Sequence, residues 1–175
     1  QFEVCIPNIC IRDIAKKKNG DYILASTEGI YTLASDFKTF SKVNNEQLLS
    51  EDITCIGEDK DKKIWFGYYH KGLGSIDSNG IIRNYSKDFH NLDATICEDL
   101  IVNHKGEVVI GTYDNGLFVY NKHLDWFLPL DVNKRNKFGR DKNPNAHKVL
   151  TLFEDEDNNL WFGTDGAGLG LYENK

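Results

Sequence analysis

The sequence LFEDEDNNLWFGTDGAGLGLY, at residues 152–172, consists of an apolar segment, a polar turn, an apolar triplet before Gly163 and a glycine-rich turn. The same pattern occurs three times earlier in the chain: as ITCIGEDKDKKIWFGYYHKGLGSI at 53–76, as DLIVNHKGEVVIGTYDNGLFVY at 99–120 and, in a weaker form, as IRDIAKKKNGDYILASTEGIYTL at 11–33. The copies follow one another at about 43 residues, apart from a longer insertion between 121 and 147 before the last copy. The chain is therefore built from four copies of one unit.

Each copy predicts a small antiparallel β-sheet. Short runs of apolar, β-branched and aromatic residues are separated by Gly, Asn and Asp, which is the pattern of strands joined by tight turns. Stacking such sheets around an axis covers both of their apolar faces. In Trp65-Phe66 and Trp161-Phe162, neighbouring side chains point to opposite faces of one strand, so both faces need a partner. The sequence thus predicts an all-β fold, a β-propeller segment of about four consecutive four-stranded antiparallel blades.

The repeat also predicts where the blades lie within this single propeller segment, 1–175. We expect them at approximately 9–43, 52–85, 95–130 and 147–175. The last copy ends after its third strand, and the run at 2–6 precedes the first copy. Residues 1–8 are therefore interpreted as an outer strand, either of a preceding blade or of the last blade, and the second alternative would close a four-bladed ring. The chain starts at Gln1 and has no Met, which favours a processed or excised piece.

The composition is that of a chain that folds around apolar cores. Of its 175 residues, 40% are hydrophobic and 27% are charged, which is ordinary for a globular domain. No apolar stretch reaches the roughly 18 residues that a membrane-spanning helix needs. The net charge of −6 argues against a nucleic-acid partner, because nucleic-acid-binding domains usually carry a basic surplus.

The copy at 152–172 resembles the repeat of the two-component regulator propeller family. The resemblance rests on Glu-Asp at 154–155, Leu-Trp-Phe-Gly-Thr at 160–164 and Gly-Leu at 168–169. The copy at 53–76 has the same features with Tyr68 in place of Thr, and the other two copies are more divergent. In that family such repeats form seven-bladed propellers in the periplasmic sensor region of hybrid two-component receptors, many of which regulate polysaccharide use in gut Bacteroidetes. The resemblance implies an arc of such a seven-bladed propeller.

The function that the resemblance implies is sensing. The segment would bind a ligand, an oligosaccharide by analogy, and relay the event without catalysis, in the periplasmic part of an inner-membrane receptor. The histidine kinase and the membrane contact would belong to other parts of the parent protein. We expect no cofactor and no metal, and we expect self-association or contact with neighbouring blades, because an arc exposes sheet faces and edges. Two alternatives are a structural or protein-interaction propeller, and a polysaccharide-acting enzyme with paired carboxylates at Asp114 and Asp165.

The candidate ligand residues lie mainly in the turns between the second and third strands. In a meander these turns share one end of the blades with the links between blades, so they form one face. Aromatic rings stack on the C–H faces of sugars, while amide and carboxylate groups bond to hydroxyls. The candidates on this face are Tyr68, Tyr69, His70, Tyr113, Asp114, Asn115 and Asp165. The alternative interpretation is that they are ordinary polar turn residues.

The long insertion adds a cluster of cations. It contains Lys134, Arg135, Lys137, Arg140 and Lys142. Arg135 and Arg140 are candidate ligands for an anionic group, because a guanidinium offers a bidentate fork. A solvated loop is the alternative.

Other patterns favour structural roles. Residues 155–159 begin like a calcium loop, but Gly166 stands where that loop needs a bidentate Glu. A tight turn explains Asp and Asn at these positions without a metal. Cys55 and Cys97 are interpreted as small buried residues, and a disulfide between Cys5 and Cys10 is left open.

Overall fold

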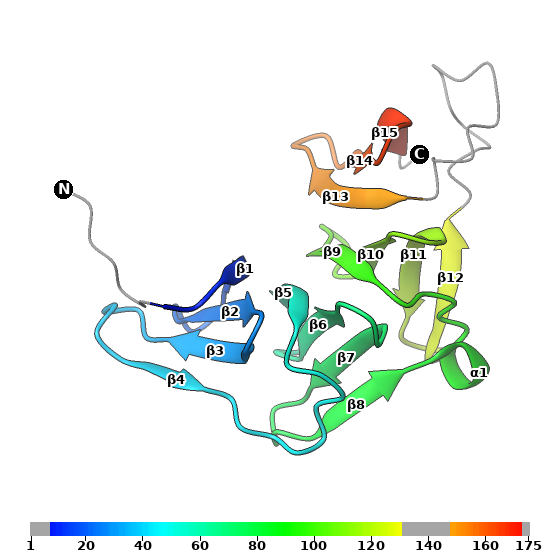
Figure 1. The fold of residues 1–175 in the computed structure, drawn as a ribbon. Helices are drawn as coiled ribbons and strands as arrows, with labels where there is room; N and C mark the ends of the chain where they lie inside the picture. Colours follow the sequence, from blue (N-terminus) through cyan, green and yellow to red (C-terminus); the bar gives the residue numbers. More distant parts are fainter. Residues whose placement is uncertain (1–7, 131–147, 173–175) are drawn as a thin grey trace.

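The computed structural model describes residues 8–130 and 148–172. These residues form four antiparallel sheets that follow one another along an arc (Figure 1). The prediction of an all-β fold made of propeller blades is confirmed. The interpretation of residues 1–8 as an outer strand concerns a segment that, apart from Asn8, lies outside the described residues.

Each sheet is a meander, in which strands that are neighbours in the chain are neighbours in the sheet. Blade 1 consists of β1 (Ile11–Lys16), β2 (Tyr22–Ser26), β3 (Gly29–Leu33) and β4 (Phe40–Lys42). Blade 2 consists of β5 (Ile53–Glu58), β6 (Ile64–Tyr68), β7 (Leu73–Ile76) and β8 (Ile82–Tyr85). Blade 3 consists of β9 (Cys97–Val102), β10 (Val108–Thr112), β11 (Gly116–Asn121) and β12 (Trp126–Leu130). The described strands of blade 4 are β13 (Val149–Glu154), β14 (Leu160–Thr164) and β15 (Gly168–Tyr172).

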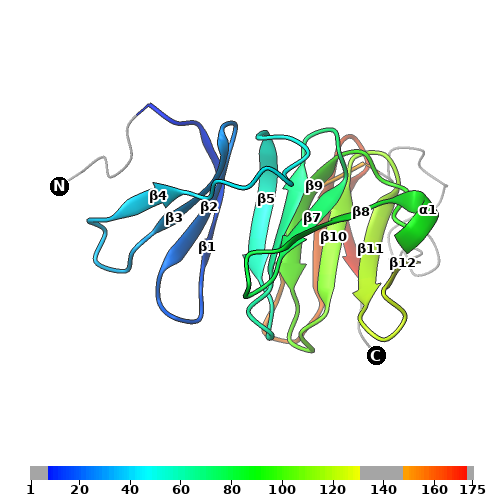
Figure 2. The ribbon, with the colours of Figure 1, turned by 90° about the horizontal axis from the view of Figure 1, so that it is seen from below.

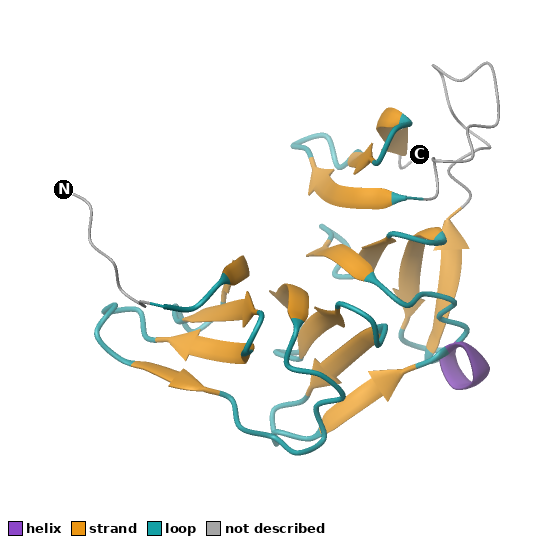
Figure 3. Cartoon of the chain, in the orientation of Figure 1, coloured by secondary structure: helices purple, strands orange, loops and turns teal. Residues whose placement is uncertain are grey.

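The first strand of every blade lies on the inner side of the arc. Figure 1 shows β1, β5, β9 and β13 around the open centre, with β4, β8 and β12 on the outside. Seen along a perpendicular direction, the strands of blades 2 and 3 run along a common direction (Figure 2). The short helix α1 (Lys87–His90) lies at the outer edge, and the rest of the described chain is strand or loop (Figure 3). Within these described ranges, no helix has the length and apolar character needed to cross a bilayer.

The blades are joined by three apolar cores, one at each junction. As predicted from the strand pleat, Phe66 and its neighbour Trp65 point into different cores, and both are fully buried. Core 1/2 contains Ile23, Ala25, Ile30, Ile53, Ile56, Phe66, Tyr68, Ile76 and Ile82. Core 2/3 contains Cys55, Trp65, Leu73, Tyr85, Leu92, Cys97, Leu100, Val108, Ile110, Phe118, Tyr120 and Phe127. Core 3/4 contains Val109, Leu117, Val149, Leu152, Leu160 and Phe162.

The glycine after the leucine of the third strand makes room for the aromatic ring opposite. Phe66 pairs with Gly74 and Phe162 pairs with Gly170. A Cβ at Gly74 would lie 2.4 Å from Phe66 Cζ, and one at Gly170 would lie 2.1 Å from Phe162 Cζ. The Gly-Leu-Gly of the repeat therefore lets the ring lie flat across the adjacent strand.

The Asp that begins the polar turn organises both the turn and the following tryptophan. Asp155 Oδ1 accepts hydrogen bonds from the N–H groups of Asp157 and Asn159, at 3.0 and 2.8 Å. Its Oδ2 accepts from Trp161 Nε1 at 2.7 Å. Asp59 makes the equivalent bond to Trp65 Nε1 at 2.8 Å. The Asp and the Trp of the repeat are thus hydrogen-bonded to each other, and the backbone bonds of Asp155 identify it as a turn residue.

Two aspartates join the innermost strands of neighbouring blades. Asp13 Oδ2 accepts from the N–H of Ile56 at 2.8 Å, and Asp99 Oδ2 accepts from the N–H of Leu152 at 2.7 Å. The Oδ1 atom of each accepts from the N–H of the residue that follows it, at 2.7 and 2.8 Å. Two carboxylates thus satisfy one N–H group in each of the four innermost strands, and they link blade 1 to blade 2 and blade 3 to blade 4.

Two glutamates link the same pairs of blades at the other end of the innermost strands. Glu58 Oε2 accepts from the backbone N–H of Lys18 at 2.7 Å. Glu154 Oε2 accepts from the backbone N–H of His104 at 2.8 Å, and its Oε1 lies 2.6 Å from His104 Nδ1. The equivalent residue of blade 3 is Val102, so the junction between blades 2 and 3 has neither kind of carboxylate link.

Candidate functional site

The innermost strand of every blade begins at one end of the molecule, which we call the link face. It carries the links between blades and the turns from the second to the third strand, at 27–28, 69–72, 113–115 and 165–167. The N–H groups of Tyr69, Tyr113 and Asp165 each donate to the carbonyl of the residue before the innermost strand, at 3.0, 3.1 and 2.9 Å. The structure therefore brings together Tyr69, Tyr113 and Asp165 at one end, each in the same place in its blade.

One group on this face lies at the junction of blades 1 and 2. The guanidinium carbon of Arg12 lies 5.2 Å from the centre of the Tyr69 ring. The same guanidinium pairs with the carboxylate of Asp52 at 2.9 Å. The ring centroids of Tyr69 and His70 are 4.1 Å apart, and both side chains are exposed. Burial raises the pKa of the nearby Glu98 carboxyl, against the opposite influence of the Arg12 cation.

A second group of the same chemistry lies at the junction of blades 3 and 4. The ammonium of Lys148 lies 5.0 Å from the centre of the Tyr113 ring. The Tyr113 hydroxyl donates to Asp165 Oδ2 at 3.1 Å, and Lys148 lies 3.8 Å from the same oxygen. Each group consists of a tyrosine ring, a cation over that ring and a carboxylate. Each group thus places an aromatic ring beside paired charges on the link face.

Asp114 and Asn115 instead hold the loops of the link face in place. Asp114 Oδ2 accepts from both the N–H and the hydroxyl of Thr95, at 3.0 and 2.8 Å. The Asn115 amide donates to the carbonyl of Asp93 at 2.6 Å. Both residues join the turn of blade 3 to the link before it, through Asp114 Oδ2 and the Asn115 side-chain nitrogen.

The interpretation of Tyr68 as a surface residue is wrong. Tyr68 is the last residue of β6 and is 0% exposed. Its ring packs edge-on against Phe66 in core 1/2, at 5.2 Å between centroids. Its hydroxyl donates to Asn84 Oδ1 at 2.8 Å and accepts from the N–H of Leu49 at 3.2 Å. The strand continues one residue further than the turn pattern indicated, and this turns the side chain inward. Arg135 and Arg140 lie outside the described residues.

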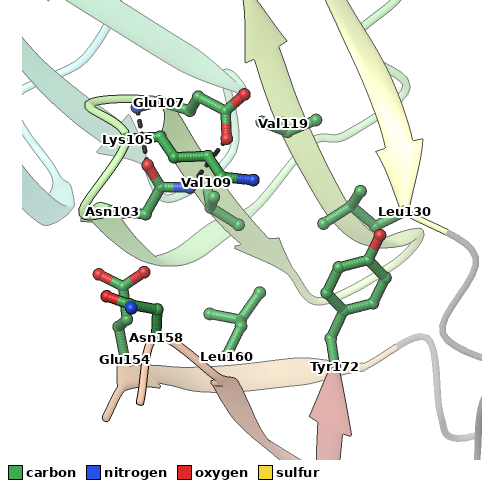
Figure 4. A pocket seen from close by; sticks show the side chains of 10 residues that line it. All are labelled: Asn103, Lys105, Glu107, Val109, Val119, Leu130, Glu154, Asn158, Leu160 and Tyr172. Carbon is green, nitrogen blue, oxygen red and sulfur yellow. Dashed lines mark hydrogen bonds between the residues drawn. The ribbon is translucent and has the colours of Figure 1, made fainter. Parts of the chain in front are cut away.

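The opposite end of the blades, which we call the hairpin face, contains a cavity that sequence reasoning missed. It carries the turns from the first to the second strand, at 17–21, 59–63, 103–107 and 155–159. A cavity of about 230 Å³ lies there between blades 3 and 4. Figure 4 shows its lining, which consists of Asn103, Lys105, Glu107, Val109, Val119, Leu130, Glu154, Asn158, Leu160 and Tyr172.

The lining of this cavity is divided between polar and apolar side chains. The Asn103 amide donates to Glu107 Oε2 at 2.9 Å (Figure 4). The Tyr172 ring lies beside Leu130 on the apolar side of the cavity (Figure 4).

A larger and more polar cavity, of about 570 Å³, lies between blades 2 and 3. The ion pair of Lys122 and Asp61, at 2.6 Å, forms part of its lining. Polar residues in a hairpin turn are so common that no sequence signal distinguishes these cavities from ordinary turns.

The part of the chain that the structure describes contains no group of three His, Cys, Asp or Glu side chains arranged to hold a metal ion. Cys55 and Cys97 are buried, as the sequence predicted, and burial raises the pKa of both thiols. Cys10 is an exposed free thiol, while Cys5 lies outside the described residues.

Comparison with solved structures places the chain among propellers. It is similar to the extracellular domain of the hybrid two-component system BT3049 from B. thetaiotaomicron, with 22% identity and a TM-score of 0.65 over 90% of this chain and 19% of that one. It is also similar to the extracellular domain of the hybrid two-component system BT4673 from B. thetaiotaomicron, with 21% identity and a TM-score of 0.57 over 99% and 28%. A streptogramin B lyase has the same fold, with 13% identity and a TM-score of 0.56 over 98% of this chain and 71% of the lyase chain. The chain thus spans less than a third of the length of the two-component relatives.

The sequence itself matches a family model. No curated protein matches the chain in sequence. The model of the two component regulator propeller matches residues 47–70 and 143–166, which include the strongest Trp-Phe-Gly copies. Two segments of the chain are therefore similar to the repeat of the two component regulator propeller.

Proposed function

We propose that the chain is a ligand-sensing segment of the extracellular, periplasmic region of a hybrid two-component receptor in the inner membrane. The observation that carries the proposal is the combination of family repeats with the fold of extracellular domains of two-component systems. In the proposed receptor the segment binds and relays, and the histidine kinase belongs to another part of the protein.

The proposed ligand is an oligosaccharide bound on the link face. The two tyrosine groups support this, because an aromatic ring flanked by charged side chains can stack on a sugar and bond to its hydroxyls. Tyr69 belongs to the junction of blades 1 and 2, and Tyr113 to that of blades 3 and 4. The carboxylates of Asp114 and Asp165 accept hydrogen bonds from Thr95 and Tyr113, and the proposal assigns them no catalytic step.

The same groups offer a route for relay. Arg12 of blade 1 pairs with Asp52, which precedes blade 2. Lys148, which precedes blade 4, lies over the ring of Tyr113 in blade 3. A ligand that engages these tyrosines or cations would bind two arrangements of neighbouring blades with different affinity, which is the requirement for a shift between them.

The proposed propeller is larger than this chain. Ile14 on the outward face of blade 1 and Phe153 on that of blade 4 are 57% and 64% exposed. In the proposed receptor, further blades cover these faces, since exposed apolar sheet faces otherwise favour self-association.

Calorimetric titration with defined oligosaccharides from pectin and heparin tests the proposal. Tyr69→Ala and Tyr113→Ala should each weaken binding about tenfold or more without unfolding the protein. Phe37→Ala is the matched control, because Phe37 is 54% exposed in the turn between β3 and β4, at the opposite end of the blades. Lys105→Ala, in the cavity between blades 3 and 4, distinguishes the two ends. A loss confined to Lys105→Ala would move the site to the hairpin face, and unchanged affinity in both tyrosine variants would remove the link face as the site.

A further inference from the structure

Two cysteines from different blades meet in core 2/3. Cys55 lies in β5 and is 1% exposed, and Cys97 begins β9 and is 0% exposed. Both are free thiols. Cys55 Sγ lies 3.7 Å from the carbonyl oxygen of Cys97. Cys55 Sγ thus reaches the backbone of Cys97 across the junction of blades 2 and 3, although 42 positions separate the two residues in the chain.

The space that they share is created by Gly67. A Cβ at Gly67 would lie 2.6 Å from Cys55 Sγ and 2.8 Å from Cys97 Cβ. Both side chains thus converge on one point that only glycine leaves open. A disulfide forms between cysteines whose Cβ atoms lie about 4 Å apart. Rotation about χ1 moves Sγ and leaves Cβ in place, so it can turn the sulfur of Cys97 toward Cys55 Sγ within this shared space.

The position of the pair in the repeat is also unusual. In blades 1 and 3 the residue equivalent to Cys55 is an aspartate, and each of these links its blade to the next one. Cys55 replaces that aspartate at the one described junction without a carboxylate link. A covalent bond at this place would join β5 to β9, as Asp13 joins β1 to β5 and Asp99 joins β9 to β13 at the neighbouring junctions.

We propose that Cys55 and Cys97 form a disulfide that joins blade 2 to blade 3 when the protein folds in an oxidising compartment. Two S–H bonds break and one S–S bond forms. Two protons and two electrons pass to the disulfide of a thiol–disulfide oxidant, which leaves as a dithiol. The proposal is independent of any ligand and of the sensor function.

Burial determines when the bond forms. The thiolate is the attacking species in thiol–disulfide exchange. Burial, followed by the neighbouring Cys97, raises the pKa of the Cys55 thiol, and burial raises that of Cys97. The oxidant therefore reacts before blades 2 and 3 close on one another, and once closed the junction protects the bond from reductants.

Peptide mapping under non-reducing conditions tests the proposal on the full chain produced in parallel in an oxidising periplasm and a reducing cytoplasm. Free thiols are alkylated in denaturant before digestion with trypsin. The sequence places Cys55 in peptide 43–60 and Cys97 in peptide 88–105, whereas Cys5 and Cys10 share peptide 1–12. The periplasmic sample should contain 43–60 joined to 88–105, at two hydrogen masses below the sum of the reduced peptides. Recovery of both peptides in alkylated form, or joined to 1–12, would overturn the proposal.

Thermal unfolding provides a second readout. The oxidised protein should unfold several degrees above the same sample after reduction, because a cross-link restricts the unfolded chain. Cys97→Ser should abolish this difference, while the matched control Cys10→Ser should retain it. A difference that persists in Cys97→Ser would assign the stabilisation to another pair and refute the proposal.

Discussion

The junction between blades 2 and 3 differs from the junctions on either side of it. Blades 1 and 2, and blades 3 and 4, are linked by hydrogen bonds from backbone N–H groups to Asp13, Asp99, Glu58 and Glu154. Blades 2 and 3 are joined instead by an aromatic core. In it the ring of Trp65 stacks on Tyr85 at 5.1 Å and meets Tyr120 at 4.7 Å.

The difference shows that one repeat can fasten its neighbours in two ways. A carboxylate link is directional and fixes the register between two strands, but it needs a donor for each oxygen because a buried charge is costly without partners. An aromatic core gains mainly from burial and tolerates small shifts. Four substitutions at the junctions, from the largest expected effect to the smallest, test this difference, and Asp155→Asn, within blade 4, serves as the comparison for one of them.

The largest loss is expected from Trp65→Ala. Trp65 is 1% exposed in core 2/3, and its removal should cost about 3–5 kcal/mol of unfolding free energy. Trp161 occupies the equivalent position in blade 4 and also bonds to the turn Asp, but it is only partly buried. Urea denaturation of both variants should therefore show a much smaller loss for Trp161→Ala. Equal losses would mean that the aromatic core does not dominate the junction.

A carboxylate at position 55 should lower the free energy of unfolding, even though the equivalent residues of blades 1 and 3 are Asp13 and Asp99. The N–H groups of Ile56 and Leu100 already donate to Asp13 and Asp99, so Asp in Cys55→Asp would find no donor. We expect a loss of about 2–4 kcal/mol by urea denaturation. Cys55→Asn is the matched control, because Asn has the size of Asp without its charge. A stabilised Cys55→Asp would show that the junction merely lacks a carboxylate.

Asp99→Asn tests the link between blades 3 and 4 and should cost about 1–3 kcal/mol at neutral pH. Burial raises the pKa of Asp99 above its ordinary value of 3.8. The folded state therefore favours the protonated form, so the contribution of Asp99 grows as the pH falls through the folded pKa and is complete below 3.8. Thermal unfolding across this pH range should show that Asp99→Asn unfolds at a lower temperature than the original protein. The difference between the two unfolding temperatures should grow as the pH falls.

For Asp155→Asn we expect the opposite pH dependence of the loss in stability. The hydrogen bond from Trp161 lowers the pKa of Asp155. Its contribution is present above the ordinary pKa and is lost as the pH falls through the lowered value. The difference in unfolding temperature between Asp155→Asn and the original protein should therefore become smaller as the pH falls. A common trend in the two variants would contradict the assignment of burial as the main influence on Asp99.

The smallest effect is expected from Glu58→Gln. Gln keeps an acceptor for the N–H of Lys18 but loses the charge, so the loss should be about 0.5–1 kcal/mol. Glu107→Gln is the control, since Glu107 accepts from Asn103 within one blade. Urea denaturation at low and high salt should show a salt-dependent loss for both. Only Glu58→Gln should reduce the protection of the Lys18 amide in hydrogen exchange, because a neutral amide oxygen accepts a weaker hydrogen bond than a carboxylate. Unchanged protection would remove the proposed link.

The sequence by itself determined the blade and much of its interior. The repeated Trp-Phe pairs require two covered faces, so Trp65 and Phe66 predicted two cores that the structure contains. The turn residues also predicted which loops share one end of the molecule, because a meander alternates ends. Local spacing is enough for these conclusions, since strand pleat and turn chemistry act within a few residues.

Only the tertiary structure decided what each side chain contacts across a junction. Tyr68 reads as part of a polar turn but is buried, and the bonds of Asp114 to Thr95 and of Asn115 to Asp93 could not be read from the turn pattern. The meeting of Cys55 with Cys97, and of Glu154 with His104, joins residues from different blades. No local pattern encodes such contacts, because they depend on how one sheet is stacked on the next.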